Sequence, residues 1–249
     1  MAVDLTRKSE THYDHAPIVE AVIEIQLQLP RSIGVTDLLR FHSTVSSEYP
    51  DKQEQHAFEI SMSGPQNPPS TSGRLAGYRF ISSDQKQIIG VRTDSFSFSR
   101  TAPYDRWESM REEAHRLWSI FRSTLGPERL TRVGVRYINR IDVPARSEGV
   151  NLDDYFETAP RIASSLPQRL TNFFMRLQIP IDEGMLLITE TSVAPPAQNL
   201  ISTLLDIDVY AQQENLDETT AWQTLERLRH EKNRVFEACI TDRVRDLIK

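Results

Sequence analysis

Asp206 and Asp208 are separated by one isoleucine in an alternating segment that is typical of a β-strand. Alternation places both carboxylates on one face of the strand and the apolar side chains between and beside them on the other. Two carboxylates so placed can bind one Mg²⁺ through hard oxygen ligands, or act as a general acid and base. The pattern is weak by itself, because the spacing fixes no third carboxylate and Glu190 is only a candidate for it.

A charged helix predicted over about 217–248 carries two polar residues on its apolar stripe. At about 100° per residue, Lys232 and Asn233 take the positions that Leu117 and Trp118 hold in an earlier helix. A buried ammonium needs a partner, since an unpaired buried charge is costly or shifts its pKa. We therefore expect Lys232 to face the sheet beside carboxylates or other polar groups.

The segment 136–140 (RYINR) supplies further polar groups, with its two arginines on one strand face and its tyrosine and asparagine on the other. We predict a polar cluster where the two halves of the chain meet. It is either a structural ion-pair network, or a site where Asp206 and Asp208 bind metal or exchange protons while Lys232 stabilises a phosphate. We assign no catalytic residue, metal ligand or cofactor. The predicted cluster contains Asp206, Asp208, Lys232 and Asn233, together with Arg136 or Asn139, depending on which face of the segment 136–140 meets them.

Hydropathy periodicity and turn residues predict two halves with a similar order of elements. The first half contains a strand, a short helix, three or four extended segments and a long helix, at 18–29, 36–47, 58–63, 74–82, 87–100 and 103–126, where 87–100 is either one long strand or a tight pair. The second contains a strand, a short helical stretch, three strands and a long helix, at 132–143, 153–164, 172–181, 185–193, 201–210 and 217–248. Gly126-Pro127 ends the first long helix, and the Pro, Ser and Gly-rich range 64–73 is predicted to be an exposed loop.

The spacing W-x7-H-x5-F occurs twice, from Trp107 and from Trp222, at an offset of 115 residues. The shared order of elements and this repeat favour an internal duplication. We predict an α+β fold of two pseudo-repeated halves, each an antiparallel sheet covered by a long helix, as in helix-grip or TATA-binding-protein-like topologies. We expect a flexible N-terminal arm over 1–15 and one globular unit over 16–249, with halves at 16–127 and 131–249.

The composition of the 249 residues restricts the functional class, since 39% are hydrophobic and can form a core without metal or disulfides. With 29 basic and 35 acidic residues the net charge is −6, which disfavours generic binding of nucleic acid or anionic membranes. The single cysteine, Cys239, excludes an intrachain disulfide and fits a reducing cytoplasm. We expect a cytoplasmic protein without membrane association, because no apolar run approaches the ~20 residues of a membrane span.

Short motifs lie in order over nearly the whole chain. They are PIVEAVIEI at 17–25, FSFSR at 96–100, PY at 103–104 with Trp107, RYINR at 136–140, LDID at 205–208 and KN at 232–233 with Phe236. In this order they resemble a sporadically distributed bacterial family of about this length and of unknown function. The resemblance carries over no catalytic residue. It implies a place on mobile or defence-type genomic islands, beside a gene for a partner protein.

Nucleotide-binding glycine loops, H-E-x-x-H and G-x-S-x-G are absent from the sequence. We expect a non-enzymatic binding or regulatory component that acts through a protein encoded by a neighbouring gene, in a defence or toxin-neutralising system. The alternative is a sensor of a nucleotide or small phosphate ligand, or a metal-dependent phosphoester enzyme, that uses the Asp/Lys cluster. Recognition of nucleic acid by a local concave surface and self-association both stay open.

Overall fold

The computed structural model describes residues 13–61, 70–145 and 149–249. These residues form an α+β fold, as predicted, with one nine-stranded sheet in which neighbouring strands are antiparallel. The strands are β1 (Ile18–Gln28), β2 (Asp51–Ser61), β3 (Ser70–Ile81), β4 (Gln87–Arg92), β5 (Ser95–Thr101), β6 (Arg129–Pro144), β7 (Phe174–Ile181), β8 (Gly184–Val193) and β9 (Leu200–Leu216).

The order of strands across the sheet is β2-β3-β4-β5-β1-β6-β9-β8-β7. The sequence predicts a separate sheet for each half, but β1 pairs with β6, and Ala21 lies opposite Tyr137. This pairing joins the strands of both halves into one continuous sheet. It also leaves β2 and β7 as the two edge strands.

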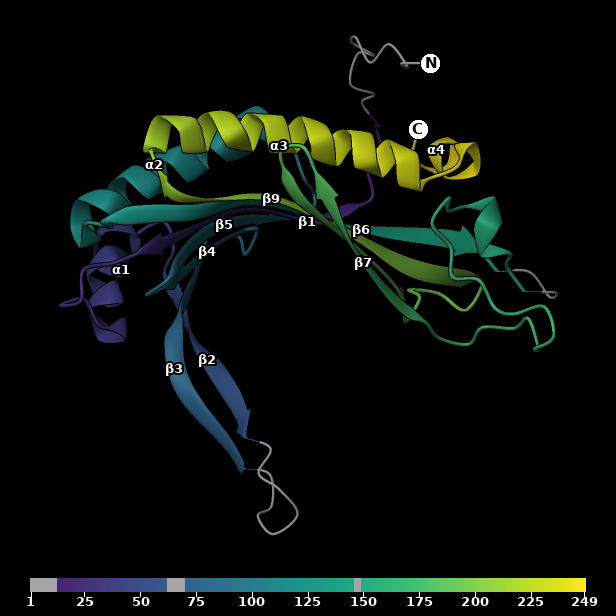
Figure 1. Ribbon diagram of the computed structural model, residues 1–249, viewed down its shortest axis with the longest axis horizontal. Helices are drawn as coiled ribbons and strands as arrows, with labels where there is room; N and C mark the ends of the chain where they lie inside the picture. Colours follow the sequence, from purple (N-terminus) through teal and green to yellow (C-terminus); the bar gives the residue numbers. More distant parts are fainter. Residues whose placement is uncertain (1–12, 62–69, 146–148) are drawn as a thin grey trace.

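Two long helices, α2 (Trp107–Leu125) and α3 (Glu218–Cys239), lie along the same side of the sheet (Figure 1). On the other side, β2 and β3 bend away from the helices (Figure 1). Gly126 caps α2 with a left-handed backbone (φ 60°, ψ 57°), as its position after the helix predicts. The shorter helical elements are η1 (Val35–Leu38), α1 (Leu39–Val45), η2 (Leu152–Asp154) and α4 (Asp242–Ile248).

Aromatic side chains fill the core between the sheet and the helices. Phe96 of β5 is fully buried, and its ring centroid lies 5.6 Å from that of Trp118 and 5.3 Å from that of Phe121. Phe41 of α1 approaches Phe96 edge-on at 6.4 Å. Aromatic pairs at such distances add about 0.5–1.5 kcal/mol each beyond the burial of their area. The alternating apolar side chains of β5 therefore pack against the apolar stripe of α2.

The predicted helical stretch at 153–164 is shorter than expected, with one turn of 3₁₀ helix at η2. The backbone that follows it forms hydrogen bonds with the end of α3. The Cys239 carbonyl accepts from the Glu157 N–H at 2.9 Å, and the Tyr155 carbonyl accepts from the Thr241 N–H at 3.0 Å. The same contacts accompany the interruption of the predicted final helix at Ile240, between α3 and α4.

Residues 1–12 of the predicted N-terminal arm, residues 64–69 of the predicted 64–73 loop and the last two residues of the predicted strand 58–63 lie outside the described residues. Within the described range the chain is already anchored at Tyr13, which is buried and whose hydroxyl donates to Glu237 Oε1 at 2.8 Å. Residues 70–73 belong to β3. None of the described helices is long and apolar enough to cross a membrane.

Candidate functional site

β6 and β9 distribute the predicted polar residues over two faces of the sheet. Tyr137 is buried and lies opposite Ile207, whereas Arg136 is exposed and lies opposite Asp208. Because side chains alternate along a strand, the arginines of β6 and the aspartates of β9 project away from the helices. We call this surface the open face. Its ion-paired residues are Glu24, Arg132, Arg136, Arg140, Asp142, Asp206 and Asp208.

The best-aligned contact of the open face joins Arg136 to Asp206. Arg136 Nε and Nη2 donate to the two carboxylate oxygens of Asp206 at 2.8 and 2.6 Å. This hydrogen bonding raises the pKa of Arg136. The side chain of Arg136 is 48% exposed and that of Asp206 17% exposed, so the pair contributes on the order of 1 kcal/mol or less to stability.

Arg132 bridges two neighbouring strands of the same face. It forms ion pairs with Glu24 of β1 and with Asp208 of β9, the latter at 3.3 Å. Its guanidinium also lies over the ring of Tyr210, 4.0 Å from the centroid. Burial raises the pKa of Asp208, although the charge of Arg132 acts in the opposite direction. The guanidinium is therefore already neutralised by carboxylates of this chain.

Lys232 and Asn139 lie on the helix-covered side of the sheet. Lys232 is 8% exposed, as its position on the helical stripe predicts, and its Nζ lies 3.7 Å from the ring centroid of Tyr137. Asn139 is buried and donates through Nδ2 to the Leu205 carbonyl at 3.1 Å. Asn233 is half-buried. A cation over an aromatic face is a favourable arrangement for a buried ammonium.

The predicted cluster is thus divided by the sheet into two groups. Asp206, Asp208 and Arg136 lie together on the open face, and Lys232 lies with Asn139 on the other side. The sequence predicts which side chains of a strand share a face. Which of the two faces the helices cover depends on how the strands pair. Among the described residues no group of three or more His, Cys, Asp or Glu side chains could hold a metal ion.

Glu190 lies on the helix-covered face, opposite Leu205, and so cannot join Asp206 and Asp208. Its side chain is fully buried, and both carboxylate oxygens lack a hydrogen-bond partner within the described part of the chain. Burial raises the pKa of Glu190 to about 7. Burial also raises the pKa of the Cys239 thiol to about 11, with the Glu190 carboxylate acting in the same direction. From the sequence alone, Glu190 is only a candidate for a third metal-binding carboxylate.

Two pockets in the described part of the chain have volumes of about 230 and 210 Å³. Both are below the roughly 300–1,000 Å³ typical of sites for drug-sized ligands. The larger one is lined by two arginines, Arg74 and Arg92. Neither pocket includes a residue of the predicted polar cluster.

Compared with known proteins, the chain matches no family model, and no curated protein resembles it at a significant level.

Proposed function

We propose that this protein is a non-enzymatic binding component that holds a partner protein on the open face of its sheet. The observation that carries the proposal is the placement of both long helices on the opposite side (Figure 1). A face of an antiparallel sheet on which no long helix packs can present a broad surface to a partner. β2 and β3 bend away from the helices and border this surface on one side (Figure 1).

The charges of the open face favour a protein over a nucleic acid. The ion-paired set contains four carboxylates and three guanidiniums, and each guanidinium is bound to a carboxylate. A phosphate backbone would have to displace those carboxylates, since nucleic-acid binding depends on cations that are free to neutralise phosphates. A protein segment with a basic residue complements the excess carboxylate without breaking the existing pairs.

The partner that we propose is the protein encoded by a neighbouring gene, in a bacterial defence or toxin-neutralising system. This rests on the family resemblance of motifs such as RYINR at 136–140. The alternative of a phosphoester enzyme that uses Asp206, Asp208 and Lys232 together requires these side chains to share a site. Their separation by the sheet counts against that alternative.

We also infer that the fold arose by duplication of a helix-grip unit. The strand order supports this inference, because β5-β4-β3-β2 extend outward from β1 as β9-β8-β7 extend outward from β6. In each half the strands are followed by a long helix, α2 or α3, on the same side of the sheet. The two copies of the W-x7-H-x5-F motif contact each other. The ring centroid of His115, from the first copy, lies 4.8 Å from that of Trp222, from the second.

Charge reversal at Asp206 tests the proposed surface. Asp206→Lys places a second cation beside Arg136 and removes a carboxylate from the open face, so we expect at least tenfold weaker binding of the neighbouring gene's protein, about 1.4 kcal/mol. Binding is measured by calorimetry with the two purified proteins.

The matched control is Glu231→Lys on α3, because Glu231 is also paired with an arginine, Arg234, and is 19% exposed. It should leave the affinity within about twofold of the unmodified protein. Equal affinities for both variants, or a larger loss for Glu231→Lys, would refute the open face as the binding surface. Thermal melting of both variants establishes that they are folded.

A further inference from the structure

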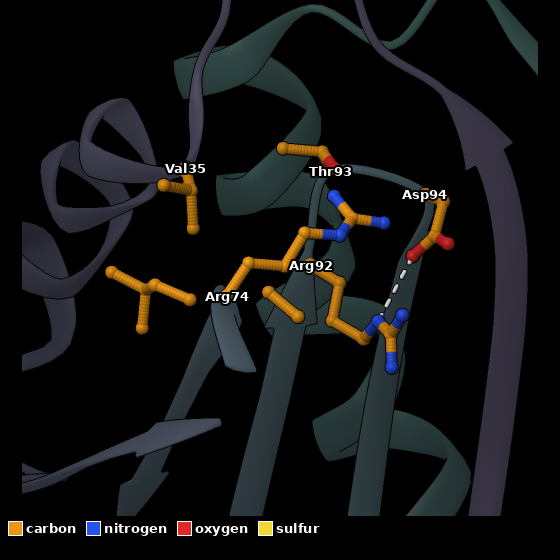
Figure 2. A pocket seen from close by; sticks show the side chains of 7 residues that line it. Val35, Arg74, Arg92, Thr93 and Asp94 are labelled. Carbon is orange, nitrogen blue, oxygen red and sulfur yellow. Dashed lines mark hydrogen bonds and ion pairs between the residues drawn. The ribbon is translucent and has the colours of Figure 1, made fainter. Parts of the chain in front are cut away.

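The larger pocket lies where the β4–β5 turn approaches β3 and the start of η1. Its volume is about 230 Å³, and apolar side chains of Val35, Leu75 and Ala76 form part of its lining. The polar part of the lining comes from Arg74, Arg92 and the turn residues Thr93 and Asp94. Figure 2 shows the guanidinium of Arg74 directed toward Thr93, whereas the guanidinium of Arg92 extends past Asp94, with which it forms a hydrogen bond.

Within residues 13–61, 70–145 and 149–249, much of the hydrogen-bonding capacity of the two arginines is unused. Arg92 donates through Nε to Asp94 Oδ1 at 3.1 Å, and the side chain of Arg92 is 42% exposed. Among the described residues, no hydrogen bond or ion pair involves the terminal amino groups of Arg92. The guanidinium of Arg74 has none either within the described part of the chain. Two guanidiniums and one carboxylate give the lining a net charge of +1. The pocket therefore attracts an anion.

The turn that carries these groups is held in place by the sheet. The Asp94 carbonyl accepts from the Leu27 N–H at 2.9 Å, which fastens the turn to β1. Gly77 of β3 lies opposite Arg92 in the strand register. A Cβ at Gly77 would lie 2.8 Å from Arg92 Cγ and 2.1 Å from the Val91 carbonyl oxygen. Glycine at this position therefore allows the stem of Arg92 to cross closely over β3.

We propose that this pocket binds the phosphate group of a small phosphomonoester. A guanidinium presents parallel N–H groups that match pairs of phosphate oxygens. The terminal amino groups of Arg92 and the guanidinium of Arg74 bind two sides of the phosphate, and the Thr93 hydroxyl donates to a third oxygen. The apolar lining contacts the small organic part of the ligand. This site does not depend on the open face and is separate from the proposed partner.

Titration with inorganic phosphate, followed by calorimetry and by ³¹P line broadening, tests the site. We expect a dissociation constant on the order of 1 mM. Arg74→Gln and Arg92→Gln should each weaken binding at least tenfold, because each removes one of the two cations. Arg169→Gln, at an exposed arginine outside the pocket lining, should leave binding unchanged.

Glycerol 3-phosphate and a phosphoserine peptide then distinguish the sources of the phosphate group. Tighter binding of glycerol 3-phosphate than of inorganic phosphate, lost in both pocket variants, supports the proposal. No saturable phosphate binding, or binding unaffected by both pocket variants, overturns it. A phosphopeptide that binds at least tenfold more tightly than glycerol 3-phosphate overturns the assignment to a small molecule.

Discussion

Replacing Phe96 with alanine is expected to lower the free energy of unfolding by about 3–5 kcal/mol. Phe96 is fully buried and makes ring contacts with Phe41, Trp118 and Phe121, so its removal leaves a cavity between β5 and α2. Such a loss is a large part of the ~5–15 kcal/mol that stabilises a typical domain. Denaturation by urea, followed by circular dichroism, measures the change.

Phe174→Ala provides the matched control, because Phe174 is also a phenylalanine on a strand but is 70% exposed. It should change stability by no more than about 0.5 kcal/mol. Similar losses for the two variants would contradict the placement of the core between the sheet and the long helices.

Glu190→Gln is expected to remove a pH dependence of stability that the unmodified protein has. Burial raises the pKa of Glu190 from 4.5 to about 7. Between these two values the folded chain keeps a proton that the unfolded chain releases, so stability falls as the pH rises. Each unit of difference in pKa corresponds to about 1.4 kcal/mol of stability. The loss of stability therefore reaches about 3 kcal/mol at neutral pH and stays nearly constant at higher pH.

Urea denaturation at pH 5 and pH 8 measures this contribution as the difference between the unmodified protein and the variant. The unmodified protein should lose about 2.5 kcal/mol more than Glu190→Gln over this interval, because part of the loss already occurs below pH 5. Glu214→Gln, at an exposed position of β9, should keep the pH dependence of the unmodified protein. A Glu190→Gln variant with that same dependence would show that the carboxyl group is solvated or paired in the folded protein.

Much of the fold could be predicted from local patterns. Alternation identified β1, β6 and β9, and the stripe of Trp107, Trp118 and Phe121 identified α2 with its end at Gly126. Both signals depend on neighbouring residues alone. The prediction of a helix at 153–164 was wrong, because the backbone of this segment forms hydrogen bonds with the distant end of α3. Tertiary contacts of this kind leave no local periodicity.

Only part of the candidate site could be predicted, because local patterns do not show which distant residues meet. Strand alternation correctly grouped Asp206 with Asp208, and helical spacing correctly placed Lys232 inward. Their positions relative to one another depend on which sheet face the helices cover, and this is a property of the assembled fold. The pocket beside Arg74 and Arg92 was not predicted either, because the turn between β4 and β5 brings together residues from separate strands.

Carbodiimide labelling of carboxylates, with and without the neighbouring gene's protein, tests the binding surface most directly. Asp206 and Glu231 are similarly exposed, at 17% and 19%, and both are paired with arginines. Complex formation should lower the labelling of Asp206 several-fold and leave that of Glu231 unchanged. Protection of Glu231 with unchanged labelling of Asp206 would place the partner on the helices and contradict the proposed binding surface.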